Sequence, residues 1–535
     1  MTRFPRRAPH LFLLGGVLAL SACGGSDGNS GDTSGKWTAG DLHVHTTQSD
    51  DSRTTQTLDF VLGKAFSTYK LDWMAITNHL RSSKYDNDGK LLAAPVPFAY
   101  GMESYEIPRI KALQAGGTYA NKLIFSGFEW DTPTHDHIGV ALFEGDPAAL
   151  VTSAAGTKEF QYAFTTLADS AFPAADVARF KAKYPQRFNT TASDALQAIA
   201  WLKTNYPTTS FATINHPSRN PGKYTVQDFR QMNDLAPEVM FMIEGMVGNQ
   251  MEPDRGGYTA AYTAANAPNR TYGGTDWVVA QVGGVWDALL GEGRRIWNIA
   301  DSDSHFEIDS ASNSSGYYPG EYSKNHVWQD GAATGVAGLK KSLRDGRMFG
   351  VFGDLINALD FRVTGSTGSG AMGQEIRLPA GERVNVTIRF KSPAINNYQK
   401  PVDSGTLGNM KPMVDHVDLI VGDVTAKAQP GTPAYGVATN ASTRVVRRFT
   451  AADWKAEGDG YFSVTAQVEV PKSQYFRLRG TNLGTDVPGL TANGEPLADR
   501  QISGTDNTAR VNAINERNYG SLWFYSNPVF VSVGS

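Results

Sequence analysis

The chain has 535 residues, of which 41% are hydrophobic and 19% charged, and its formal net charge is −4. Its length exceeds that of one ordinary hydrophobic core and predicts about two or three folded units. Because this weakly acidic balance offers no broad cationic surface of the kind that tracks a phosphate backbone, we expect no nucleic-acid partner.

The first 36 residues carry the features of an export signal. An apolar run from Leu11 to Leu20 follows several arginines and is about half as long as a bilayer-spanning helix. It ends in Leu-Ser-Ala-Cys, which resembles a bacterial lipoprotein box, and Cys23 is the single cysteine of the chain. We expect residues 1–22 to be a signal peptide and residues 23–36 to be a lipidated cysteine with a flexible tether. The protein would then be anchored to a membrane of the bacterial cell envelope, facing the periplasm or the exterior.

Short apolar runs alternate with helical patterns between residues 37 and 355. Residues 54–70 and 193–205 each place apolar side chains on one helical face, and residues 144–187 fit a helical or irregular insertion. Strand and helix in alternation predict a parallel α/β unit, with a barrel as the favoured form. The candidate strands are DLHVH, LDWMAITNH, NKLIFSGFE, HIGVALF, SFATINH, EVMFMIE and RIWNIADSDSH.

Residues 356–535 show a different pattern, in which apolar and polar residues alternate with a period of two. The stretch RVNVTIRFK places Val384, Val386, Ile388 and Phe390 on one face, and YFSVTAQVEV repeats the alternation. This pattern predicts a second, smaller, all-β domain that is sandwich-like.

Histidines and carboxylates gather at the ends of the candidate strands. In α/β barrels the C-terminal strand ends meet at one face, so these side chains are expected to share a cavity. Each of these residues, taken alone, could have an ordinary structural role in a turn, a cap or an ion pair. Imidazoles and carboxylates crowded together, however, need a compensating cation. Two or three divalent ions fit a set that is rich in imidazole and lacks thiolate, with zinc, manganese or iron favoured. The residues are His43, His45, His79, Glu129, His216, Asp303 and His305.

Six stretches also resemble the successive motifs of a known superfamily. DLHVHTTQSD, LDWMAITNHL, FSGFEW, HDHIGV, TINHPSR and ADSDSH are similar, in this order, to those of the PHP (polymerase and histidinol phosphatase) superfamily. The closest resemblance is to its long envelope members of unassigned function with a β-rich C-terminal domain. It implies a distorted (β/α)7 PHP-type barrel and a trinuclear site. The implied ligands are His43, His45, Glu129 and Asp303 for the first ion, Glu129, His137 and His216 for the second, and Asp50, His79 and His305 for the third.

Three positions keep alternatives open. Asp51 competes with Asp50 for the third ion. His135 competes with His137, which opens its candidate strand instead of closing it. Asn78 stands where the superfamily usually has aspartate, and this difference affects the third site.

Other polar residues near these motifs have expected roles of their own. Arg81 and Arg219 follow ligand candidates closely, and their guanidinium forks suit an anionic substrate, with ordinary surface charge as the alternative. Glu244 closes a strand at the same face and is expected behind the ligands. His326 and His416 match no motif and are expected to be structural.

The expected activity is metal-dependent hydrolysis. A phosphomonoester or phosphodiester would be attacked by a hydroxide that bridges two ions, with Glu129 between the ions and Asp303 accepting the proton. The substrate would be a small molecule, an anionic ester. One alternative is a carbamate or carboxylic ester hydrolase with the same centre. The other is a non-catalytic surface lipoprotein that binds a glycan or a partner protein.

Overall fold

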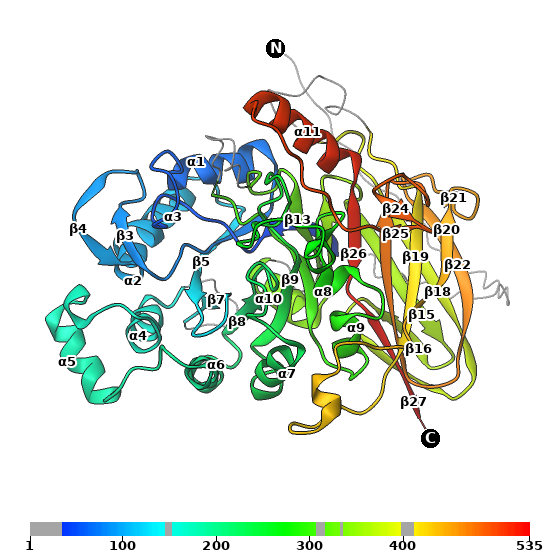
Figure 1. The fold of residues 1–535 in the computed structure, drawn as a ribbon, viewed down its shortest axis with the longest axis horizontal. Coiled ribbons are helices and arrows are strands. Elements are labelled where there is room, and N and C mark those ends of the chain that lie inside the picture. The colour runs from blue at the N-terminus through cyan, green and yellow to red at the C-terminus, as the bar shows by residue number, and fades with distance from the viewer. Residues whose placement is uncertain (1–34, 145–151, 306–315, 332–334, 397–410, 535) are drawn as a thin grey trace, which may run out of the picture.

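The computed structural model describes residues 35–144, 152–305, 316–331, 335–396 and 411–534. The expected signal peptide, Cys23 and all but the end of the expected tether lie outside these residues. Mixed α/β structure fills the blue-to-green part of the chain and β structure dominates the yellow-to-red part (Figure 1). This arrangement confirms the expected order of an α/β part followed by a β-rich part. Within the described residues, no helix combines the length and the apolar character needed to cross a bilayer.

The strands around the candidate site form parts of two sheets. β1, β2 and β5 run parallel in one sheet, and β8, β9 and β12 run parallel in the other. β7 is antiparallel to both of its neighbours, β6 and β8, so the expectation of an entirely parallel unit is wrong here. The bounds are β1 (Lys36–Asp41), β2 (Trp73–Ile76), β5 (Leu123–Ser126), β6 (Phe128–Asp131), β7 (His137–Leu142), β8 (Ser210–Ile214), β9 (Met240–Met246) and β12 (Trp297–Ala300).

Two isolated bridges connect these sheets where their strands end. Val44, beyond β1, pairs with Ser304, beyond β12, and His79, beyond β2, pairs with Glu129 in β6. Both bridges are parallel and both contain or adjoin candidate ligands. The two sheets therefore approach each other at the place where histidines and carboxylates were expected to meet.

Helices cover the outer sides of these strands. Capping boxes start two of them, because Thr191 and Asp194 pair reciprocally at α6, as do Thr225 and Asp228 at α7. α6 confirms the helix expected over residues 193–205, and α4 and α5 give the expected insertion its helical character. The helices here are α1 (Leu58–Leu62) with η1 (Gly63–Thr68), α2 (Phe98–Gly101) with η2 (Met102–Glu106), α3 (Ile107–Ala115), α4 (Ala154–Phe164), η3 (Asp169–Ala171), α5 (Ala174–Lys183), α6 (Ala192–Asn205), α7 (Val226–Leu235), η4 (Ala267–Asn269), α8 (Trp277–Ala280), α9 (Val285–Leu290) and α10 (Gly335–Asp345).

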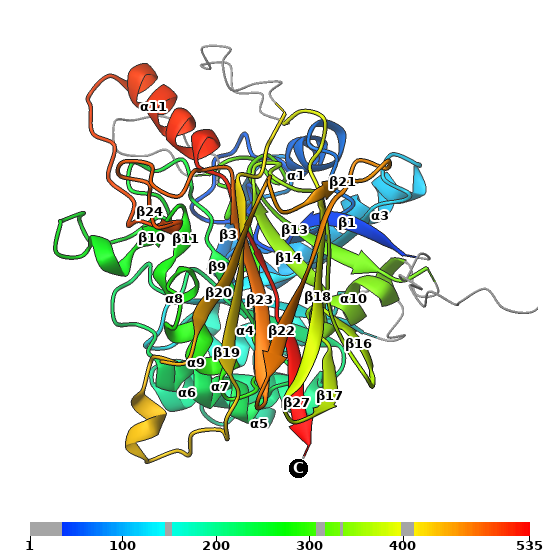
Figure 2. The ribbon, with the colours of Figure 1, turned by 90° about the vertical axis from the view of Figure 1, so that its right-hand side faces the viewer.

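The β-rich part contains a five-stranded antiparallel sheet beside strands of a larger sheet (Figure 2). The apolar face expected in β18 is confirmed, because Val384, Val386, Ile388 and Phe390 are all buried. The smaller sheet has the order β16 (Gly368–Ala371), β15 (Ala358–Gly365), β18 (Glu382–Lys391), β22 (Phe462–Val470) and β21 (Lys455–Ala456).

The larger sheet crosses the boundary expected near residue 355. β14 pairs with β13 on one side and with β26, from the end of the chain, on the other. The two parts therefore share a continuous sheet of 11 strands. Its order is β17 (Glu375–Pro379), β27 (Val529–Gly534), β23 (Gln474–Thr481), β26 (Trp523–Ser526), β14 (Met348–Phe352), β13 (Ser323–Gln329), β1, β2 and β5, with β19 (His416–Asp423) and β20 (Arg444–Thr450) joined at β23.

The expectation that the C-terminal part is all-β is wrong at one place. α11 (Asn507–Gly520) precedes β26 at the junction of the two parts (Figure 1). The Asp506 side chain caps it by accepting from the backbone N–H of Ala509, and it buries Val511 and Ile514. The remaining short strands are β3 (Ser82–Tyr85), β4 (Leu91–Pro97), β10 (Thr271–Tyr272), β11 (Thr275–Asp276), β24 (Thr491–Ala492) and β25 (Glu495–Pro496), and η5 spans Pro433–Gly436.

Candidate metal centre

The ends of six strands bring the candidate ligands to one rim. β1, β2, β8 and β12 each end two to five residues before their histidines or aspartate, and Glu129 lies within β6. His137 is the first residue of β7. Because β7 runs antiparallel to its neighbours, its beginning lies at the same rim as their ends. The direction of this strand explains how a residue that opens a strand joins residues that follow strands.

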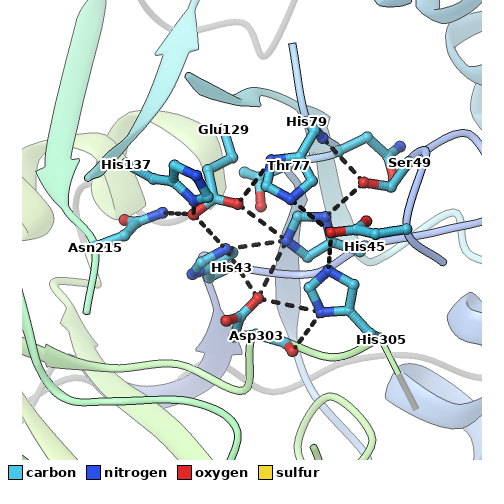
Figure 3. Close-up of polar contacts among 12 residues, drawn as sticks. His43, His45, Ser49, Thr77, His79, Glu129, His137, Asn215, Asp303 and His305 are labelled. Carbon is cyan, nitrogen blue, oxygen red and sulfur yellow. Dashed lines mark hydrogen bonds and ion pairs between the residues drawn. The ribbon is translucent and has the colours of Figure 1, made fainter. Parts of the chain in front are cut away.

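The first predicted ligand set comes together as a compact cluster (Figure 3). His43 Nε2 lies 3.1 Å from Glu129 Oε1 and 3.2 Å from Asp303 Oδ1. His45 Nε2 lies 3.2 Å from the same Asp303 oxygen and 3.1 Å from His43 Nε2. All four side chains are almost fully buried. Their ligand atoms therefore face one shared point.

Glu129 divides its two carboxylate oxygens between two sets of imidazoles. Oε1 lies 2.9 Å from His137 Nδ1 and 3.0 Å from His216 Nε2, which are the other members of the second predicted set. Oε2 lies 3.2 Å from His79 Nδ1 and 3.4 Å from His45 Nε2. A carboxylate placed in this way can bridge two cations.

The third predicted set forms with Asp51 in place of Asp50. Asp51 Oδ2 lies 2.8 Å from His79 Nε2 and 3.2 Å from His305 Nε2. Asp50 instead accepts a hydrogen bond of 3.2 Å from Arg81 Nη1. The expectation for Asp50 is therefore corrected in favour of its neighbour, because the turn after His45 directs the second of the two carboxylates toward the imidazoles.

The ligand atoms form a chain of overlapping groups. Among the described residues, four groups have ligand atoms that all lie within 4.8 Å of one another, and His45, His79, Glu129 and His137 each belong to two of them. Overlap of this kind suits several neighbouring ions more than one isolated ion. The groups are His43, His45, Glu129 and Asp303; His45, Asp51, His79 and His305; His79, Glu129 and His137; and Asp136, His137 and His216.

Groups behind the histidines fix their ring orientations. His43 Nδ1 lies 3.0 Å from Glu244 Oε2, as expected for a carboxylate behind the ligands, and His45 Nδ1 lies 3.0 Å from Ser49 Oγ. His216 Nδ1 lies 3.5 Å from Asp136 Oδ2. Such outer contacts select the tautomer and leave the other ring nitrogen available to a metal.

Two ligand candidates have strained backbones. His216 has a φ of 27° and Asp303 a φ of 47°, in the left-handed region that residues other than glycine rarely adopt. Each such residue costs on the order of 1–3 kcal/mol and persists where its surroundings hold it. The surrounding structure therefore holds two ligand candidates in a conformation that they rarely adopt elsewhere.

Charges in the centre shift one another's pKa values. Burial alone would lower the pKa of His43, but the carboxylates of Asp303 and Glu129 outweigh this effect and raise that pKa well above its ordinary value. Burial would raise the pKa of Glu129, yet the imidazoles of His137, His43 and His79 hold it well below its usual range. The buried carboxylates therefore need positive charge beside them, from protons on the imidazoles or from cations.

The cluster fits divalent metal ions. Among the described residues, Asp303 Oδ1, His79 Nδ1 and His305 Nε2 are buried and make no hydrogen bond of good geometry, although each lies 3.2 Å from at least one other candidate ligand atom. Unpaired buried polar atoms are uncommon and call for a ligand, an ion or water. A set of imidazoles and carboxylates without thiolate is the chemistry preferred by zinc, manganese and iron. The residues present thus suit the ions that the sequence predicted.

Arg81 and Arg219 are both engaged with carboxylates. Arg81 forms a bidentate pair with Asp131, through two hydrogen bonds of 2.7 Å. Arg219 Nη2 donates to Asp136 Oδ1 at 2.8 Å. These contacts occupy the guanidinium forks and position carboxylates that lie next to His137 and His216. Contact of either arginine with a substrate stays a prediction.

Asp303 differs from its expected role in one respect. One of its oxygens was expected to be free to accept a proton, but Asn249 Nδ2 donates to Oδ2 at 2.5 Å. The side chain is thus held from one side while Oδ1 faces the imidazoles. We infer that Asn249 serves mainly to orient the Asp303 carboxylate, with Oδ1 directed toward the imidazoles.

His135, the alternative to His137, lies outside the ligand groups. Its Nδ1 lies 2.9 Å from the carbonyl oxygen of Pro133 and its Nε2 lies 3.3 Å from Asp228 Oδ1. The geometry therefore favours His137. His326 stacks on Phe349 and has its pKa lowered to about 3, chiefly by burial, which fits the structural role expected for it.

The sequence analysis did not identify several residues of the site. Asp136 and Asn215 directly precede ligand candidates, and Asn215 Nδ2 donates to Glu129 Oε1 at 2.9 Å, so their sequence position offered a signal. Asn249 and Glu252 lie in a loop without any motif. Burial and the nearby Asp254 raise the pKa of Glu252 to about 8.

Comparison with known proteins gives one solved structure to report. No protein-family model and no curated protein matches the chain. The chain is similar to the crystal structure of a two-domain protein containing a predicted PHP-like metal-dependent phosphoesterase from Bacteroides vulgatus, with 12% sequence identity and a TM-score of 0.32. The match covers 87% of this chain and 94% of that one. The function of this chain is therefore inferred from its own side chains.

Proposed function

We propose that this protein is a metal-dependent hydrolase, and more narrowly a phosphoesterase of the PHP type. The observation that carries the proposal is the position of Glu129. Its Oε1 faces His137, His216 and His43, and its Oε2 faces His45 and His79, all within 3.4 Å. A buried carboxylate shared by separate sets of imidazoles is the arrangement that holds two or more ions close together. A purely structural metal site would close around one ion and needs no such bridge.

The chain's own residues would hold and orient the reacting groups. Bound divalent ions would supply a water molecule of lowered pKa and positive charge for the oxygens of a phosphoester. Asp303 presents Oδ1 to His43 and His45, and Glu244 holds His43 from behind. Arg81 and Arg219 hold Asp131 and Asp136, the carboxylates that lie beside His137 and His216.

The finer fold and the location are part of the same proposal. We interpret eight strands as the distorted seven-stranded barrel, closed by the bridges at Val44 and His79. They are β1, β2, β5, β6, β7, β8, β9 and β12, and β5 and β6, separated by one residue, count as a single barrel strand. The substrate would be a small anionic ester, and we expect no nucleic-acid partner. Lipidation of Cys23 would keep the enzyme in the bacterial cell envelope.

A substrate panel tests this proposal. The full-length chain, purified without chelator and supplied with Mn²⁺ or Zn²⁺, is incubated with nitrophenyl esters of phosphate, phosphodiester and carbamate type. We expect phosphoester hydrolysis that is lost in His43→Ala and Glu129→Gln. The matched control is Glu469→Gln, an exposed residue of β22. Turnover of the carbamate alone would favour carbonyl chemistry, and no turnover by a metal-loaded chain would favour a binding protein.

A further inference from the structure

The loop of residues 249–255 reaches the metal centre through one side chain. Asn249 Nδ2 donates to Asp303 Oδ2 at 2.5 Å, and the backbone N–H of Asn249 donates to the carbonyl oxygen of Ser302 at 3.2 Å. Asn249 itself has a φ of 53°, in the left-handed region that residues other than glycine adopt uncommonly, so its surroundings must support this conformation. The loop packs closely here, because a Cβ on Gly248 would lie 2.3 Å from Asp303 Cβ.

That support comes from the C-terminal helix. Arg517 of α11 donates through Nη1 to the carbonyl oxygen of Pro253 at 2.7 Å and through Nη2 to that of Glu252 at 3.0 Å. Asn518 Nδ2 donates to the carbonyl oxygen of Gln250 at 2.7 Å. Hydrogen bonds from a charged guanidinium are stronger than neutral ones. Three successive parts of the loop are thus tied to two adjacent residues of one helix.

Other residues lock the helix and the loop together. Arg255 Nη1 lies 3.5 Å from Asp499 Oδ1, and Arg255 Nε donates to Gln250 Oε1 at 2.8 Å. Arg255 Nη2 also donates to Tyr322 OH at 2.9 Å, and Tyr322 OH donates in turn to the carbonyl oxygen of Asn518 at 2.9 Å, which connects the loop to α11. Arg255, Gln250 and Asn518 are each buried to 2% exposure or less. The interface between α11 and the 249–255 loop is therefore buried and hydrogen-bonded, unlike an incidental surface contact.

We propose that α11 positions the metal centre, with Arg517 and Asn518 holding the 249–255 loop so that Asn249 fixes the orientation of Asp303. This assigns to the C-terminal part of the chain a role in the metal affinity of the α/β part. It rests on the proposed metal centre and deepens it. Arg517 is a positioning residue, because its side chain contacts the loop and not the ligands. Outer contacts to ligands commonly change metal affinity by about 10–100-fold.

The test measures ion binding and does not depend on turnover. The full-length chain and its variants are titrated with Mn²⁺ against a competing chelator, and the Co²⁺-loaded forms are compared by visible absorption. We expect Arg517→Ala and Asn249→Ala each to weaken Mn²⁺ binding by about 10-fold or more and to change the Co²⁺ spectrum in the same way. Glu516→Ala, at the exposed neighbouring position of α11, should stay within about twofold of the unmodified chain, as expected for a site that shares no partner with the loop.

A double variant identifies the route of the effect. If Arg517 acts through Asn249, the Arg517→Ala/Asn249→Ala chain should bind Mn²⁺ about as weakly as the weaker single variant, because coupled residues are not additive. The proposal would be overturned if the losses of Mn²⁺ affinity in the two single variants multiplied in the double variant. It would also be overturned if Arg517→Ala bound Mn²⁺ within about twofold of the unmodified chain.

A milder variant keeps the proposal testable if Arg517→Ala does not fold. Folding is judged from a cooperative thermal transition of the metal-free protein. Arg517→Lys keeps the charge and the aliphatic stem but lacks the fork that serves two carbonyls, so it should weaken binding by a smaller factor and shift the Co²⁺ spectrum in the same direction. An unchanged spectrum in a folded Arg517→Lys chain would overturn the proposal. A chain that binds ions normally but hydrolyses nothing would count against the proposed function alone.

Discussion

His43 is held between the metal centre and Glu244, with its Nδ1 3.0 Å from Glu244 Oε2 and its Nε2 facing Asp303. Glu244 is fully buried and its other oxygen accepts from the backbone N–H of Gly248 at 2.8 Å. The carboxylate therefore keeps the proton of His43 on Nδ1. A cation that displaces the second proton of this imidazolium would therefore find the electron pair of Nε2 directed toward it.

Replacing Glu244 should weaken the centre without removing a ligand. In Glu244→Gln the amide can present its NH₂ group to Nδ1 and favour the wrong tautomer, so we expect Mn²⁺ or Zn²⁺ affinity to fall by about 10–100-fold. Chelator competition measures this change. The exposed Glu469→Gln serves as the control. Unchanged affinity in Glu244→Gln would show that the ring is oriented by other contacts.

Replacing Asp51 should remove one ion, and replacing Asp50 should not. Asp51 lies within 3.2 Å of two imidazoles, whereas Asp50 contacts Arg81. We expect Asp51→Asn to bind about one divalent ion fewer per chain and Asp50→Asn to keep the full number. Metal analysis after gel filtration gives the count. The reverse result would restore Asp50 as the ligand.

The sequence predicted most of the ligands because their motifs lie at strand ends. His43, His45, Asp303 and His305 follow strands whose apolar character was plain, so their convergence could be expected from topology. His137 could not be derived in this way, because the antiparallel direction of β7 depends on long-range pairing. The choice between two adjacent aspartates depends on the rotation of one turn, which local sequence does not determine.

The parts that sequence reasoning missed depend on contacts between distant segments. Asn249 and Arg517 carry no motif, and they are connected only because α11 packs on the 249–255 loop. α11 itself was assigned to an all-β domain because its few apolar residues stand among polar ones. Its burial is created by the junction with the α/β part, which local periodicity does not reveal.

Metal binding should stabilise the protein more strongly as the pH rises. Burial alone would lower the pKa values of His137 and His305, but Glu129 next to the first and Asp51 next to the second raise both to about 9. In the metal-free protein, protonation of these histidines contributes fully to the free energy of unfolding at pH values below 6.5, their ordinary pKa. This contribution is lost as the pH rises through about 9.

Divalent ions bind the neutral imidazoles and compete with those protons. The increase in Tm caused by Mn²⁺ should therefore grow between pH 6.5 and about 9, because the proton bound in the metal-free state becomes easier to displace. Calorimetry with and without the ion at each pH measures this difference. His137→Gln and His305→Gln should each flatten the trend. A metal-induced increase that shrinks over this range would contradict the assignment.

The contacts of Asn78 explain why this chain has Asn-His where the PHP motif usually has Asp-His. Asn78 Nδ2 donates to Glu106 Oε2 at 3.0 Å, while Asn78 Oδ1 accepts from the backbone N–H of Thr46 at 2.7 Å. Burial raises the pKa of Glu106 to about 8. The amide thus connects the ligand loop to a buried carboxyl group and is itself no ligand.

Asn78→Asp should destabilise the protein, and more so at high pH. The new carboxylate removes the donor to Glu106 and places a second acid beside it, so one of the two must keep a proton in the folded state. Such a raised carboxyl pKa weakens stability as the pH rises above about 4.5, since the unfolded chain ionises freely there. We expect a loss of about 1–3 kcal/mol in the free energy of unfolding near neutral pH, measured by urea denaturation. Asn78→Asp/Glu106→Gln should recover most of it, because the glutamine amide can donate to the new aspartate. A double variant as unstable as Asn78→Asp alone would show that the loss arises at Thr46 instead.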